Sequence, residues 1–370
     1  MKKPFIHVLN SFLLFLFLFI GGIYLAADFL IPVTIAALIA SLCLPLCKHL
    51  EKLNFGRVFS ILICLMLIIG FMVGFAYIFY NQVLSFASAM PSFQEMALRK
   101  FHYIQSLIQD RTTISTVKQM EWLEHKYTFF LDSGDEIIQN IFLRATHFLA
   151  LFGLIFIYVF FFLLYRKKFK FFVFKFFQQE SYTEVNKIIN RIQVLSKDYF
   201  SGVLMVMAIL GTMHTIGLMI LGIEYPFFLG YLAALLIIIP YIGTIIGSAF
   251  AIIVALLTKD SLWYAVGVAC VFTFNLFIEN NILTPIIIGS KVKINALAVV
   301  IAIILGGMLW GIAGMILFIP LLGMVKIICD TVPSLFPFGY LLEDEKFPSV
   351  NYKWVSRTVL YFKNKIYRHV

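Results

Sequence analysis

The chain has 370 residues, of which 62% are hydrophobic and only 13% charged, and its mean hydropathy is +0.96. Soluble domains are about 45–50% apolar and about 25% charged. A chain this apolar has too few polar side chains to cover a water-facing surface. This composition excludes a soluble globular enzyme and a disordered segment. The net charge of +10 is typical of basic cytoplasmic loops in a membrane protein, so we expect no nucleic-acid partner.

Five apolar runs are close in length to the roughly 20 residues that a helix needs to cross the hydrocarbon core of a bilayer. The first follows a basic start and resembles a signal peptide, but a second run follows almost at once, so we expect an uncleaved membrane span. In chain order the five predicted spans are 11–27, 31–47, 58–80, 148–165 and 202–222.

Two segments between these spans are more polar. Residues 81–147 carry six Lys/Arg and seven Asp/Glu, with apolar residues at three- and four-residue steps and a turn with a capping box at Ser133-Gly134-Asp135-Glu136. We expect a small helical extracytoplasmic insertion. Residues 166–199 carry eight Lys/Arg and an amphipathic stripe, which predicts a cytoplasmic segment contacting anionic lipid headgroups. The basic loops place both termini in the cytoplasm.

Two further apolar runs, 227–257 and 295–325, are long for one span and short for two. Pro240 and Gly243 interrupt the first, and Gly306, Gly307, Gly311 and Gly314 are the expected hinge or break of the second. Each run is either one kinked or tilted span or a re-entrant hairpin. Hairpins would keep Lys291 and Lys293 inside, which the positive-inside tendency favours.

The most polar intramembrane stretch lies between these runs. Inserting a charged side chain at mid-bilayer costs roughly 2.5–3.5 kcal/mol, so such residues usually have a function. Glu279 could bind a cation or exchange a proton. The alternative is a surface position where Glu279 pairs with Lys291 or Lys293. His214, in the fifth span, more often indicates hydrogen-bonded packing than a proton carrier. The predicted substrate or ion site comprises Glu279, Asn280, Asn281, Asn275, Thr244, Pro240, Gly243 and Pro285.

No pair of the five cysteines has CxxC spacing, and the sequence contains no Walker, HExxH or GxSxG motif. We therefore expect no metal site, no cofactor, no ATP-driven step and no enzyme activity.

Several ordered motifs of the carboxyl half resemble the autoinducer-2 exporter (AI-2E) family of bacterial inner-membrane proteins. They are Leu221–Pro226 leading into Leu229-Gly230, Ile239–Gly243, Ile278–Asn281 with Pro285 and Gly289, the four glycines of the second broken run, and Ile319-Pro320-Leu321. The resemblance implies about eight membrane segments, a homo-oligomer, and transport of autoinducer-2 or antiport of sodium or lithium against protons. It covers the chain from about residue 10 to 342.

The sequence thus predicts an all-α polytopic protein of the bacterial inner membrane, with lipid and a small-molecule or cation substrate as partners. The expected function is secondary, ion-coupled export of the AI-2E type, and the alternative is a non-transporting scaffold or envelope-assembly protein. The predicted regions are three membrane helices in 1–80, the insertion in 81–147, a fourth helix in 148–165, the basic segment in 166–199, the transport core in 200–328 and a cytoplasmic tail in 329–370.

Overall fold

The computed structural model describes residues 5–89, 92–100 apart from 94 and 97, 150–177, 182–240, 242–289 and 294–344. These ranges are helical, and their only β-type pairing is an isolated bridge between Ile294 and Glu343. The predicted turn at Ser133 and most of the predicted insertion lie outside the described residues.

Five helices of the described ranges are long and apolar enough to cross a membrane, and a sixth follows if Ala150–Leu164 and α6 (Arg166–Phe174), bent by 62°, form one span. The five are Ala27–Lys52, Arg57–Ser88, Tyr182–Ile220, Leu262–Ile287 and Ala296–Thr331. The predicted helical membrane fold is therefore confirmed. The figure of about eight segments stays a prediction.

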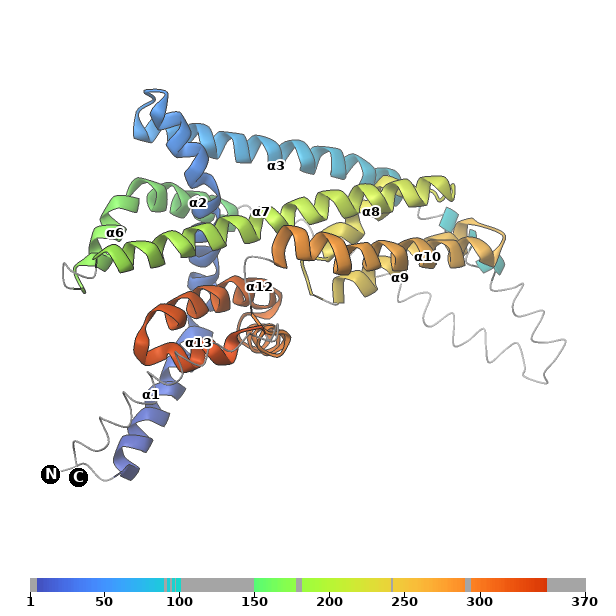
Figure 1. The fold of residues 1–370 in the computed structure, drawn as a ribbon. Helices are drawn as coiled ribbons and strands as arrows, with labels where there is room; N and C mark the ends of the chain where they lie inside the picture. Colours follow the sequence, from blue (N-terminus) through green and yellow to red (C-terminus); the bar gives the residue numbers. More distant parts are fainter. Residues whose placement is uncertain are drawn as a thin grey trace.

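The amino-terminal helices follow each other closely. α1 (Phe5–Leu25) and α2 (Ala27–Lys52) are separated by Ala26 alone (Figure 1). This break is shorter than the loop at 28–30 that lies between the two predicted spans. α3 (Arg57–Ser88) extends beyond the predicted span. Buried side chains of α2, α3 and the Ala150–Leu164 helix form one hydrophobic core, which includes Ala36, Ile61 and Val159.

α7 (Tyr182–Ile220) is the central helix, since it packs on α2, α8, α10 and α12 (Figure 1). It joins the predicted amphipathic stripe and the predicted fifth span into one continuous helix. The polar stretch around Ser196-Lys197-Asp198 contains no proline, and the single Gly202 costs too little to end a helix with a packed face. Leu195 and Tyr199 are buried along this joint.

The first broken run folds back as a helical hairpin made of α8 (Pro226–Leu236) and α9 (Ile242–Thr258). A methyl group at Gly247 would lie 2.7 Å from Ala233 Cα, and one at Gly243 would lie 1.7 Å from the Leu236 carbonyl oxygen. Backbones this close require glycine. Pro240, which has no N–H to continue a helix, lies at the tip.

The second broken run also folds back. α12 (Ala296–Thr331) contains non-helical dihedrals at Trp310 and Gly311, and the φ of +59° at Gly311 favours glycine. A methyl group at Gly306 would lie 2.4 Å from the Gly314 carbonyl oxygen. In a straight helix these residues would be about 12 Å apart. Each hairpin is predicted to leave the membrane on the same side from which it enters, and this stays a prediction.

Two shorter segments complete the described chain. α10 (Leu262–Ile278) contacts α7 and α9, and continues into the π-helical turns Glu279–Leu283 and Pro285–Gly289. After α12, a 3₁₀ turn (Pro333–Leu335) and α13 (Phe336–Leu342) return the chain onto α12. Asn295 fixes this return, because its Nδ2 donates to the Leu341 carbonyl over 2.7 Å.

Candidate transport cavity

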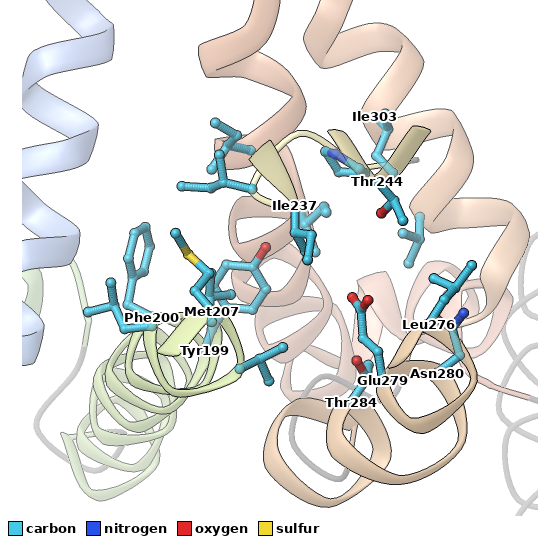
Figure 2. Close-up of a pocket in the computed structure, with 18 of the residues that line it drawn as sticks. Tyr199, Phe200, Met207, Ile237, Thr244, Leu276, Glu279, Asn280, Thr284 and Ile303 are labelled. Carbon is cyan, nitrogen blue, oxygen red and sulfur yellow. The ribbon is translucent and has the colours of Figure 1, made fainter. Parts of the chain in front are cut away.

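A cavity of about 570 Å³ lies where α7, both hairpins and the end of α10 meet (Figure 2). α7 contributes one wall, the tip of the α8–α9 hairpin a second, and facing residues of the two arms of α12 a third. Its lining consists of Tyr199, Phe200, Val203, Leu204, Val206, Met207, Ile237, Ile238, Pro240, Thr244, Ile245, Leu276, Glu279, Asn280, Thr284, Val299, Ile303, Ile316 and Ile319.

The change from α-helix to π-helix places the polar residues of this site. α10 ends at Ile278, and Glu279 begins the first π-helical turn. Pro285 begins the second turn and removes one backbone donor. π-helical turns are rare and occur frequently at functional sites, because they widen the helix and re-aim its side chains.

Glu279 is half-buried, and its carboxylate points into the space bounded by Tyr199, Ile237 and Thr244 (Figure 2). Within the described ranges, no hydrogen bond or ion pair joins this carboxylate to another group. The alternative partners Lys291 and Lys293 lie outside the described residues. A carboxylate among apolar side chains is costly unless a proton or a cation neutralises it.

The structure brings half of the predicted site residues together. Glu279, Asn280, Thr244 and Pro240 line the cavity. The remaining four are not among its lining residues: Asn275, Asn281, Gly243 and Pro285.

Three of these four residues, Asn281, Gly243 and Asn275, stabilise the fold instead. The Asn281 Nδ2 donates to the Phe277 carbonyl of its own helix over 2.9 Å. Gly243 permits the tight turn of the first hairpin, and Asn275 bonds to α7. The predicted hinge glycines form the second hairpin, whose arms contribute to the cavity wall.

Asn275 forms a buried polar pair with His214. The Asn275 Nδ2 lies 2.9 Å from the His214 Nδ1, and both residues are buried. An amide nitrogen only donates, so Nδ1 accepts and the imidazole carries its proton on Nε2. The ring also stacks on Phe272, with centroids 4.2 Å apart. Because the Glu279 N–H donates to the Asn275 carbonyl, this pair fixes the helix one turn before the carboxylate.

Tyr199 and Thr284 line the cavity although neither belongs to the site predicted from the sequence. Thr284 follows Asn281 by three residues and precedes Pro285, so its place beside the polar stretch was a usable signal. Tyr199 follows Leu195 by four residues and therefore continues the apolar stripe of α7. The sequence predicts a lipid-contacting cytoplasmic segment for that stripe, so its pattern gave no reason to place Tyr199 in a cavity.

Comparison with known sequences finds related proteins over most of the chain. A family profile described as AI-2E family transporter matches residues 13–334. The YueF protein of Bacillus subtilis is 29% identical over 333 residues, which cover 84% of this chain and 86% of YueF. YrrI of the same organism is 37% identical over 131 residues, which are 35% of this chain and 36% of YrrI. The names of both describe them as candidate transport proteins. The AI-2 transport protein TqsA of Escherichia coli K12 is 24% identical over 331 residues, covering 87% of this chain and 92% of TqsA.

Proposed function

Because this chain belongs to the AI-2E family of membrane transporters, we propose that it is a secondary exporter that couples the export of a small molecule or cation to a proton gradient at Glu279. The sequence contains no Walker motif, so an ion gradient is the expected energy source. The name of the relative TqsA makes autoinducer-2 the first cargo to test.

One observation carries this proposal: a carboxyl group without a partner in the described chain points into an apolar cavity. Such a group is stable when protonated, or when a cation lies against it. Exchange between these two states couples the movement of a proton to that of a cargo. A scaffold protein has no use for such an acid, which supports a transporter over the scaffold alternative.

The hairpins supply the element that moves. Helix breaks at membrane depth are tolerated only where protein or water covers them, and interrupted helices form the binding sites of many secondary transporters. Here the tip of α8–α9 and both arms of α12 line the cavity. We propose that the α8–α9 hairpin is re-entrant from the outer side of the membrane and the α12 hairpin from the cytoplasmic side. A shift of one hairpin against α7 would then expose Glu279 to either side in turn.

We also propose that the protein lies in the bacterial cytoplasmic membrane as a homo-oligomer with both termini inside. The orientation rests on the basic loop at 48–57 and the basic segment 166–199. The ion pair between Arg166 and Glu51 joins these two segments at one end of the molecule, which supports their lying on the same side.

The test uses purified protein in liposomes with a pH dye inside. An outward-directed gradient of autoinducer-2, sodium or lithium is imposed, and proton movement is followed. We expect one of these gradients to drive proton flux with the wild-type protein and none with Glu279→Gln. The control Asp260→Asn makes the same chemical change at an exposed residue outside the cavity, and should retain the flux. Equal proton flux with Glu279→Gln would refute coupling at this residue.

A further inference from the structure

The chemical class of the cargo can be argued from the cavity wall. Fourteen of its nineteen lining residues are apolar, and the remaining five are Tyr199, Thr244, Glu279, Asn280 and Thr284. Burial of apolar surface contributes about 25 cal/mol per Å². A cavity of about 570 Å³ falls within the range of drug-sized ligand pockets. The site therefore favours an organic molecule with a large apolar surface over a small, fully hydrated solute.

The charge in the cavity is of one sign. Among the described lining residues none is Lys, Arg or His, and Glu279 is the only acid. Of the elements packed around it, α7 presents one further ionisable side chain, Tyr199. The described lining residues of both hairpins present none. An anionic cargo would meet an unneutralised carboxylate, whereas a monovalent cation would neutralise it.

Resting on the proposed function, we infer that the cargo is an amphiphilic organic monocation, whose charge lies against Glu279 and whose apolar groups contact the isoleucine-rich wall. The aromatic rings of Tyr199 and Phe200, which also line the cavity, can contribute cation–π attraction. The four neutral polar side chains supply hydrogen bonds that orient the molecule.

This assignment gives a one-for-one exchange. A cation entering the cavity displaces the proton of the Glu279 carboxyl group, and that proton leaves to water. The site is neutral before and after the step, because a carboxylic acid is replaced by a carboxylate with its cation. Protons and cargo therefore compete for one group, and low pH weakens cargo binding.

The experiment compares two probes of nearly equal size and shape and opposite charge, tetraphenylphosphonium and tetraphenylborate. Radiolabelled probe is equilibrated with the full-length protein in nanodiscs, and binding to protein-free nanodiscs is subtracted. We expect saturable binding of tetraphenylphosphonium with one site per chain, no saturable binding of tetraphenylborate, and loss of binding as the pH is lowered.

Three variants localise the binding. Glu279→Gln should weaken tetraphenylphosphonium binding about tenfold or more and remove its pH dependence. Ile316→Trp should block the cavity while the carboxyl group is retained, and Asp260→Asn should bind like the wild-type protein. Size-exclusion profiles confirm that each variant is folded. Should Glu279→Gln fail to fold, Ile316→Trp still tests the location of the site.

The outcomes separate this inference from the proposed function. Binding of both probes alike, or undiminished cation binding by Glu279→Gln and Ile316→Trp, shows lipid-like adsorption and overturns the inference. Proton-coupled flux of another cargo without tetraphenylphosphonium binding also overturns it, but leaves the proposed function intact. Binding that depends on Glu279 without any proton-coupled flux supports the cavity assignment and removes the proposed transport.

Discussion

The Trp310 indole Nε1 donates a hydrogen bond of 3.1 Å to the Ile23 carbonyl, and so joins the tip of the second hairpin to the end of α1. Ile23 is two residues from the end of its helix, where carbonyl oxygens have no helical donor. The same indole ring packs edge-on against Phe318 in the returning arm, with centroids 5.3 Å apart. The hairpin is thereby fixed at its tip, opposite the arms that line the cavity.

Replacing Trp310 by Phe tests this contact. The variant keeps an aromatic ring against Phe318 but loses the donor, and an intramolecular hydrogen bond contributes about 0.5–1.5 kcal/mol. We expect a lower melting temperature in detergent. The matched control is Trp263→Phe, because Trp263 is 79% exposed. Equal melting temperatures of the two variants would contradict a stabilising role for the bond.

Gly314→Ala should prevent the second hairpin from closing. The added methyl group would lie 1.9 Å from the Gly306 carbonyl oxygen, which is backbone and cannot move aside without opening the hairpin. We expect loss of the monodisperse peak in size-exclusion chromatography. Gly74→Ala in α3 is the control, since a methyl group there meets no atom within 4 Å. A normal profile for Gly314→Ala would mean that the two arms do not pack this closely.

Backbone rules explain which features of the fold were predictable. Proline lacks a backbone donor and glycine allows close approach of backbones, so Pro240 and Gly311 predict broken helices from the sequence alone. The length of α7 was not predicted. The charged pair Lys197-Asp198 follows a basic segment, so the sequence favours a boundary between a surface helix and a membrane span, whereas the structure continues one helix through it and buries Leu195 and Tyr199 beside it.

The sequence predicts which residue types form the candidate site, but not the directions in which their side chains point. Glu279 and Asn275 are one helical turn apart, and the polar pattern gave both the same expected role. The structure directs one into the cavity and the other towards His214, which is 61 residues away in the chain. That choice depends on how α10 rotates against α7, which no local pattern contains.

The pair of His214 and Asn275 should show energetic coupling. His214→Phe keeps an aromatic ring beside Phe272 but leaves the Asn275 amide buried without its partner, which costs about 1–3 kcal/mol. Adding Asn275→Leu removes the unsatisfied amide. We expect the double variant to be more stable than the sum of the two single changes predicts, as measured by denaturation in detergent. Additive losses would show that the two side chains do not interact.

Accessibility of position 279 to water distinguishes a transport cavity from a lipid-filled gap. On a background without the five native cysteines, Glu279→Cys should react with a water-soluble, membrane-impermeant methanethiosulfonate, because the carboxylate it replaces points into the cavity. Phe274→Cys is the control: the Phe274 side chain is 62% exposed on the same helix, on a face that lipid would cover. Cysteine at 274 should stay unmodified while cysteine at 279 is labelled.

If the cavity opens to the two sides in turn, reagent added to either side of the membrane will reach position 279, and a proton gradient will change the ratio of the two labelling rates. Labelling at 274 alone, or at neither position, would mean that water does not reach the acid, and proton exchange at Glu279 would then have no path.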